Sequence, residues 1–344
     1  MNMGIDDRRR RGADPADGSY TSEAKKGSPL HANIVASFER NVWEDRRCIA
    51  FHALSDTNSP RPDTIFPMRL LAGLAVTTIC LLAQTSQPAG KAAITRMYVF
   101  GDSYSDTGAG YVDGNGPTAV AFFAQKLGLK LVVPGDADAN SGSINFAVSG
   151  AQTGKGSGRK VKESLLGRGM VDQVEDFVAR VNAKSITFTP DKTLFYLAGG
   201  LNDRRLPGTE TVTNLEGQIR KLYAVGARRF RLALLPTAIP GFSEVGTRLN
   251  PELERIPREV QAELPGIDIR LSRWGQFFDE VMQNPSMYGI ENTKDACAGR
   301  ALFDQDPTPC PKPEAYYYYH AGHPSAAVNK IVGDKLYTEF QAPR

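Results

Sequence analysis

The sequence lacks the ligand-rich, basic or long apolar segments that mark several common classes of protein. With four cysteines and four histidines in 344 residues, it has no set of ligands typical of a zinc or other metal centre, and we expect no metal or organic cofactor. No basic stripe with interleaved aromatic residues is present and the net charge is only +3, so nucleic acid is not an expected partner. A hydrophobic content of 41% and a charged content of 23% are typical of a soluble globular protein.

The longest apolar run, Leu70–Ala83, follows the short basic start Met68-Arg69. A basic start, an apolar core of about 7–15 residues and then small or polar residues are typical of a secretory signal peptide. The run is too short for a spanning helix, which needs about 20 residues. We therefore predict a signal peptide at residues 68–89, cleaved after Ala83 or Ala89, an extracellular or periplasmic location, and no stable membrane span.

A signal peptide belongs at an N-terminus, yet residues 1–67 precede this one. This segment is rich in Arg, Asp, Ser and Pro and has no sustained hydrophobic period. Our main interpretation is an upstream extension from a misassigned start codon. The alternative is a disordered leader on a membrane-anchored protein, with Leu70–Ala83 as a short anchor.

Cysteine usage agrees with export. Beyond the predicted signal peptide only Cys297 and Cys310 remain, an even pair that we expect to form a disulfide in an oxidising compartment. Closing a loop of this size stabilises the fold by about 3 kcal/mol in the chain-entropy model.

Short apolar runs alternate with longer amphipathic stretches from Ile94 to the C-terminus, with no internal repeat. Near-continuous apolar strands that alternate with helices indicate a parallel sheet covered on both faces. We therefore predict one domain over residues 94–344, a three-layer α/β/α sandwich with a mostly parallel, doubly wound (flavodoxin-like) sheet. The expected strands are 97–100, 194–197, 230–235 and 267–271, and the expected helices are 118–127, 169–181, 211–225, 252–264, 273–282 and 326–340.

Four short segments carry residues suited to catalysis. Ser103 follows the first expected strand and Asn202 follows the second, so both belong at the carboxyl edge of the sheet, where ligands bind in this architecture. Gly150 lies in a turn in which a backbone N–H can approach a developing oxyanion. Taken singly, these residues are equally typical of a common turn or a helix cap.

The fourth segment, residues 320–325, contains the only histidines that follow the predicted signal peptide. His31 and His52 precede it, so an imidazole base must be His320 or His323. A serine hydroxyl needs an adjacent base to take its proton, and the pKa of histidine suits that role.

Taken together and in order, the four segments resemble the GDSL lipase/esterase family, also called SGNH hydrolases. The resemblance runs from about Ile94 to the C-terminus. It includes Leu234-Leu235-Pro236 and the stretch from Asn284-Pro285 to Cys297 found in lipase-like and thermolabile-haemolysin/lecithinase-like members.

The resemblance implies a serine hydrolase that cleaves carboxylic esters through an acyl-enzyme. Ser103 then becomes the nucleophile, and His323, which is followed by proline as in the family, becomes the base. The oxyanion hole would consist of the backbone N–H groups of Ser103 and Gly150 and the side-chain amide of Asn202.

One position departs from the family, which usually has an aspartate three residues before the base, where this chain has His320. Three arrangements remain open. A backbone carbonyl could orient His323 in a Ser–His dyad, a carboxylate such as Asp304 or Asp306 could come from elsewhere, or His320 itself could be the orienting group. The dyad is our preferred interpretation.

Two further segments and the substrate stay open. Residues 150–158 lack the spacing of a phosphate-binding loop, and we expect a mobile basic loop there. Tyr316–Tyr319 could line a substrate pocket or simply bury one face of a strand. The substrate could be a lipid, an acetylated carbohydrate or a small-alcohol ester, and the alternatives to hydrolysis are acyl transfer or a non-catalytic glycan- or lipid-binding role. We expect a monomer.

Overall fold

The computed structural model describes residues 93–343. The predicted extension at 1–67 and signal peptide at 68–89 lie outside these residues. Within the described part of the chain, no helix combines the length and the apolar character needed to cross a membrane.

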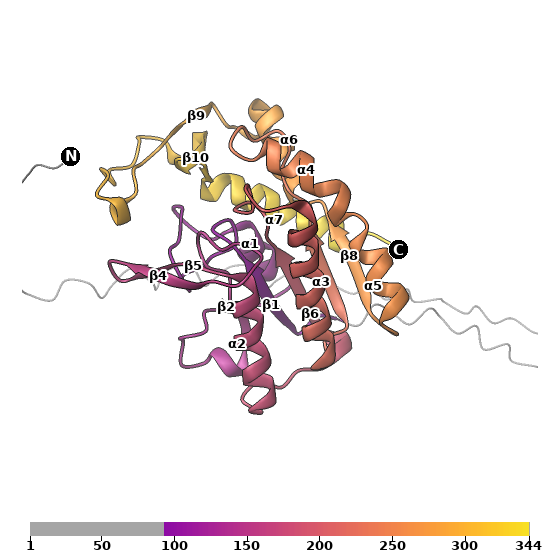
Figure 1. Ribbon diagram of the computed structural model, residues 1–344. Helices are drawn as coiled ribbons and strands as arrows, with labels where there is room; N and C mark the ends of the chain where they lie inside the picture. Colours follow the sequence, from indigo (N-terminus) through magenta and orange to yellow (C-terminus); the bar gives the residue numbers. More distant parts are fainter. Residues whose placement is uncertain (1–92, 344) are drawn as a thin grey trace, which may run out of the picture. The chain divides into compact units, whose positions relative to one another are not determined.

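The core of the fold is a six-stranded sheet in which all pairs of neighbouring strands run parallel (Figure 1). Its strand order is β2-β3-β1-β6-β7-β8, so the chain passes from β1 to the edge strand β2, returns to β3 beside β1, and then continues on the other side of β1 through β6, β7 and β8. This is the doubly wound arrangement, and the predicted fold class is confirmed. The strands of this sheet are β1 (Arg96–Gly101), β2 (Leu131–Val132), β3 (Ser143–Asn145), β6 (Thr193–Ala198), β7 (Arg229–Ala233) and β8 (Asp268–Ser272).

Seven α-helices within residues 93–343 cover the two faces of this sheet. Helices α1, α6 and α7 pack together on one face, while α2 and α3 pack on the other, where α4 and α5 contact α3. The bounds are α1 (Ala119–Lys126), α2 (Met170–Asn182), α3 (Gly208–Ala224), α4 (Ser243–Leu253), α5 (Ile256–Glu263), α6 (Trp274–Gln283) and α7 (Ala326–Gln341).

Burial on both faces explains why the central strands are apolar almost without interruption. All six residues of β6 are buried, and Met97 to Phe100 of β1 are fully buried. On the α2 face, Phe177 packs against Tyr98 and Phe195, with ring centroids 4.6 and 5.5 Å away. These contacts help to hold β1 and β6 in their positions along the strand direction. They therefore also help to position the loops at the carboxyl ends of these strands.

Two smaller sheets flank the carboxyl edge. One is an antiparallel hairpin of β4 (Ser157–Val161) and β5 (Ser164–Arg168). The other has three strands in the order β11-β10-β9, formed by β9 (Asn292–Ala296), β10 (Tyr316–His320) and β11 (His323–Pro324). Short 3₁₀ helices complete the described elements: η1 (Ala139–Ser141), η2 (Pro190–Lys192), η3 (Pro285–Tyr288), η4 (Ala301–Phe303) and η5 (Pro313–Ala315).

Two expectations need correction. The helix predicted over 252–264 corresponds to α5 but begins later, because residues 252–253 are the end of α4 and α5 begins at Ile256 with a proline in its first turn, a position that suits proline. The loop expected at 150–158 ends early, because Ser157 and Gly158 already belong to strand β4.

Candidate active site

Ser103 lies on a tight turn directly after β1. The carbonyl of Asp102 accepts hydrogen bonds from the N–H groups of Ser105 and Asp106, both at 3.0 Å, which closes one helix-like turn around the serine. Buried Gln173 of α2 holds the end of the strand, because its side chain bonds both the N–H and the carbonyl of Gly101, at 3.0 and 2.9 Å. The backbone under Ser103 is therefore fixed from the sheet and from α2.

His323 reaches Ser103 from the far end of the chain. It lies in β11, immediately before α7, whose first turn is capped by the side chain of Ser325. Its Nε2 atom is 2.8 Å from Oγ of Ser103. The hydroxyl of Tyr104 donates a 2.9 Å hydrogen bond to the carbonyl of Gly322, which ties the serine turn to the histidine turn. Nucleophile-to-base geometry of this kind is what proton transfer from a hydroxyl requires.

Among residues 93–343, no carboxylate bonds the other ring nitrogen of His323. Its Nδ1 atom lies 3.1 Å from the carbonyl of Ala321 and 2.5 Å from Nη2 of Arg300, which also donates to that carbonyl at 2.8 Å. The pKa of His323 is lowered to about 4, mainly by burial and also by the charge of Arg300, while the carboxylate of Asp113 acts in the opposite direction.

Asp113 is the acidic residue that the sequence analysis missed. Its Oδ1 atom accepts from Nε of Arg300 and from Nδ1 of His320, both at 2.8 Å, and its Oδ2 atom lies 3.4 Å from Nε2 of His323. The side chain is only 4% exposed. Burial alone would raise the pKa of Asp113, but the hydrogen bond from His320 and the charges of His323 and Arg300 outweigh it and hold the pKa below its ordinary value.

Of the orienting groups considered from the sequence, a backbone carbonyl, that of Ala321, lies against Nδ1 of His323, while the three side chains lie elsewhere. His320 is buried and its side chain bonds Asp113, and within residues 93–343 no side-chain hydrogen bond joins it to His323. Asp304 pairs with Lys162 at 2.7 Å on the surface, and Asp306 accepts from the N–H of Thr308. The structure therefore brings neither Asp304 nor Asp306 to the imidazole.

Gly150 and Asn202 line one cavity of about 560 Å³ at the carboxyl edge of the sheet. Gly150 has φ +80°, a conformation that favours glycine. In the described part of the chain, the N–H groups of Ser103 and Gly150 donate to no protein acceptor. The amide of Asn202 donates to the carbonyl of Ala151 at 2.8 Å, and its second hydrogen stays available.

Two buried aspartates hold the turn that contains Gly150. Asp106 accepts from the N–H of Ser149 at 2.7 Å on one side, and Asp203 accepts from the N–H of Thr153 at 3.1 Å on the other. Burial raises the pKa of Asp106 to about 6, although four backbone N–H groups act against the rise. These aspartates fix the backbone on both sides of Gly150, a role that only the folded structure makes visible.

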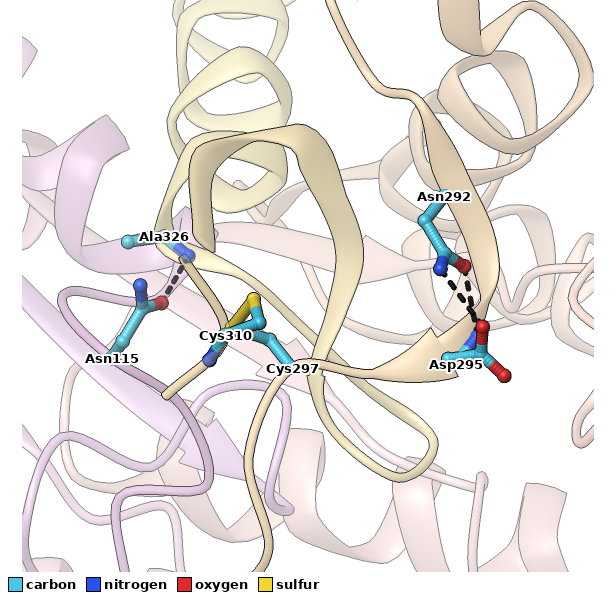
Figure 2. Close-up of a disulfide and its surroundings, with 6 residues drawn as sticks. All are labelled: Asn115, Asn292, Asp295, Cys297, Cys310 and Ala326. Atoms are coloured by element: carbon cyan, nitrogen blue, oxygen red, sulfur yellow. Dashed lines mark hydrogen bonds between the residues drawn. A yellow bond between two sulfur atoms is a disulfide. The ribbon is translucent and has the colours of Figure 1, made fainter. Parts of the chain in front are cut away.

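The remaining predicted features fall around this centre. Cys297 and Cys310 form a disulfide, drawn in Figure 2, which closes the loop that carries Arg300. Tyr317 and Tyr318 are buried in β10, where the hydroxyl of Tyr317 donates to the carbonyl of Phe278, so these two side chains belong to the core. Among residues 93–343, no group of three or more His, Cys, Asp or Glu side chains is arranged to hold a metal ion.

The protein-family model described as GDSL-like lipase/acylhydrolase matches residues 97–336. Curated relatives include a GDSL esterase/lipase of Arabidopsis thaliana, 22% identical over 333 aligned positions that cover 76% of this chain and 95% of the relative. Another, GDSL esterase/lipase 7 of the same plant, is 23% identical over 317 positions, covering 70% and 87%.

Solved structures of similar proteins include a psychrotrophic esterase from Pseudoalteromonas, with a TM-score of 0.38 and 13% identity over 72% of this chain and 97% of that one. An acetylxylan esterase from Geobacillus stearothermophilus has a TM-score of 0.38 and 14% identity, covering 74% of this chain and 97% of that one.

Proposed function

Because the chain belongs to the GDSL-like lipase/acylhydrolase family and is a carboxylic ester hydrolase, we propose that it cleaves esters through an acyl-enzyme on Ser103, with His323 as the base. The matched stretch, residues 97–336, includes both side chains. The observation that carries the proposal is the 2.8 Å separation of Nε2 of His323 from Oγ of Ser103, two atoms that are 220 positions apart in the sequence.

In the first half-reaction, Oγ of Ser103 attacks the ester carbonyl carbon while its proton passes to Nε2 of His323. The carbonyl oxygen becomes an oxyanion, and the N–H groups of Ser103 and Gly150 and the amide of Asn202 donate to it. Removing one such donor typically costs about 3–4 kcal/mol in the barrier. The availability of these donors supports their assignment to the oxyanion hole.

Collapse of the tetrahedral intermediate breaks the bond to the alcohol, and the imidazolium of His323 gives its proton to the departing alkoxide. In the second half-reaction a water molecule gives a proton to Nε2, attacks the acyl-enzyme and releases the acid. The proton then returns to Oγ of Ser103, so that the enzyme is regenerated with one water consumed.

The substrates we propose are esters of lipids, of acetylated carbohydrates or of small alcohols. The cavity beside Gly150 and Asn202 is lined by backbone at several glycines and by Lys155 and Arg159, which suits a polar group of the substrate. We further propose that the enzyme is secreted, and the disulfide between Cys297 and Cys310 supports an oxidising compartment.

Hydrolysis of p-nitrophenyl esters from acetate to palmitate by the full chain tests the proposed reaction. We expect turnover by the wild type, a loss of at least about 1,000-fold in kcat for Ser103→Ala and for His323→Ala, and unchanged turnover for the control Ser286→Ala, whose side chain is exposed. Wild-type turnover in Ser103→Ala, or no hydrolysis of any ester by the wild type, would contradict the proposal.

A further inference from the structure

At the position where the family usually has an aspartate, this chain has His320, which bonds a different aspartate, Asp113. His320 pairs with His323 across the antiparallel strands β10 and β11, yet its Nδ1 atom bonds Asp113 at 2.8 Å. Asp113 comes from a glycine-containing loop near the start of the fold, 207 positions away. A buried carboxylate therefore lies beside the proposed base His323, although a histidine occupies the sequence position where the family usually has its aspartate.

The fold clamps this loop on both sides of Asp113. Before it, the carboxylate of Asp106 accepts from the N–H of Tyr111 at 2.9 Å. After it, Oδ1 of Asn115 accepts from the N–H of Ala326 at 2.7 Å, a bond drawn in Figure 2 at the first residue of α7. Since α7 begins shortly after His323, this bond fixes the position of the loop relative to the histidine.

Arg300 makes the carboxylate necessary. Its guanidinium lies 2.5 Å from Nδ1 of His323, and a cation at that distance opposes protonation of the imidazole. Nε of the same guanidinium bonds Asp113 at 2.8 Å, so the carboxylate offsets this charge. Its second oxygen, 3.4 Å from Nε2 of His323, lies at the edge of the ring that receives the proton from Ser103.

We propose that Asp113 is the positioning residue that stands in for the missing family aspartate: held by His320, it fixes Arg300 and supplies the negative charge that stabilises the protonated form of His323. The proposal rests on the proposed acyl-enzyme mechanism. No proton moves to Asp113, because the proton taken from Ser103 stays on Nε2 of His323 until the alcohol leaves. Asp113 stays a carboxylate throughout.

The charged and titratable groups facing His323 are few, which makes the proposal testable by pH. They are Asp113 from the loop before α1, Arg300 from the disulfide loop and His320 from β10, while the ring of Tyr104 packs against the imidazole at 5.6 Å. Removing the carboxylate alone leaves the cation of Arg300 unopposed. Removing both charges leaves the imidazole with the carbonyl of Ala321.

The experiment measures kcat and KM for p-nitrophenyl ester hydrolysis from pH 3.5 to 8. We expect Asp113→Asn to lower kcat by about 100-fold with little change in KM, since the lost charge acts on the transition state. Asp138→Asn is the matched control, because Asp138 is exposed and away from the site, and it should keep wild-type kinetics. The double variant Asp113→Asn/Arg300→Met should have a kcat at least about tenfold higher than that of Asp113→Asn.

If Asp113→Asn does not fold, the single variant Arg300→Met still tests the proposal. With the cation gone and Asp113 present, the acid limb of kcat/KM should move to higher pH by at least about one unit. A merely structural Asp113 would leave the double variant no better than Asp113→Asn, and an unmoved acid limb in Arg300→Met would equally overturn the proposal. If instead Ser103→Ala retains wild-type turnover, the acyl-enzyme mechanism itself fails, so the two failures are distinguishable.

Discussion

At the scale of single residues, the environment of His323 differs strongly from that of an isolated histidine in water. The imidazole side chain is 13% exposed, and Nδ1 meets a carbonyl and a guanidinium in place of a carboxylate. Such a site favours the neutral ring, which is the form that would accept a proton from Ser103 in the proposed mechanism. The cost is a weaker base, and the carboxylate of Asp113 offsets part of it.

This environment predicts an unusually acidic lower limit of activity. Burial lowers the pKa of His323 to about 4, and the base is active only when neutral, so activity is lost as the pH falls through about 4. The measurement is the pH dependence of kcat/KM on a soluble ester, with activity after return to pH 7 as the control for unfolding. An acid limb near pH 6.5, the ordinary value for histidine, would contradict this account.

Asp102, the residue before the proposed nucleophile Ser103, should make stability depend on pH. Burial raises its pKa from 3.8 to about 7. The folded state then keeps a proton that the unfolded state loses, so the stabilising contribution is complete below pH 3.8 and is lost as the pH rises through 7. The full difference is about 4 kcal/mol as an upper bound.

The variant Asp102→Asn removes this titration while Oδ1 can still accept from the N–H of Tyr104. The free energy of unfolding in urea, measured at pH 4.5 and pH 8, should shift in favour of the variant at the higher pH by a few kcal/mol. An equal difference between variant and wild type at both pH values would show that Asp102 does not titrate in this range.

The residues that sequence alone identified are those marked by a local motif. Ser103 follows an expected strand, His323 comes just before the last expected helix, and each carries a side chain with distinctive chemistry. Asp113 and Arg300 have no local signal, because an acid between small residues and an arginine in a loop are ordinary surface features. Their importance arises from contacts 187 positions apart, which no local pattern encodes.

At the scale of elements, the close contact of β1 with β6 sets the position of Ser103, the proposed nucleophile. A Cβ atom on Gly101 would lie 2.4 Å from the carbonyl oxygen of Ala198, which belongs to the neighbouring strand and cannot move as a side chain can. We expect Gly101→Ala to lower stability by about 1–3 kcal/mol, as overpacking does, and to reduce kcat by displacing Ser103. Thermal unfolding and ester turnover measure both effects.

Gly241→Ala is the control for this variant, because a Cβ atom there meets nothing within 4 Å. It should unfold and turn over like the wild type. Equal behaviour of the two variants would mean that the strand end tolerates the extra atom.

The disulfide loop is the second element with a measurable role. Cys297 and Cys310 close a loop with a sequence separation of 13, and Arg300 lies within it. We expect C297S/C310S to lose about 3 kcal/mol of stability in the chain-entropy model. Reduction of the wild type should lower its unfolding midpoint to that of the double variant, which should not respond to reductant. Unchanged midpoints in both experiments would refute this role.

Element boundaries were predictable where the hydrophobic pattern is strong. Strands β1, β6 and β8 and helices α1, α2, α6 and α7 agree with the expected ranges to within two residues. Helix α4 was missed because it contains Pro251, which usually ends a helix, and the hairpin β4-β5 was missed because its glycines and lysines are typical of loops.

At the scale of the whole molecule, the sheet brings together residues from three crossovers. Ser103 follows β1, Gly150 follows β3 and Asn202 follows β6, and these strands are neighbours in the order β3-β1-β6. Because they run parallel, their carboxyl ends lie at one edge. His323, on strand β11 just before the last helix, reaches Ser103 at the same edge. The sequence motifs predict a shared site at this edge, because they occur along the chain in the same order as the strands that carry them.

The account as a whole depends on Ser103 being activated by His323, and covalent trapping measures this most directly. The full chain is treated with a fluorophosphonate probe, and the labelled peptide is identified by mass spectrometry. We expect one adduct, on Ser103, absent in Ser103→Ala and formed at least about 100-fold more slowly in His323→Ala. An adduct on another residue, or labelling of His323→Ala at the wild-type rate, would contradict the account.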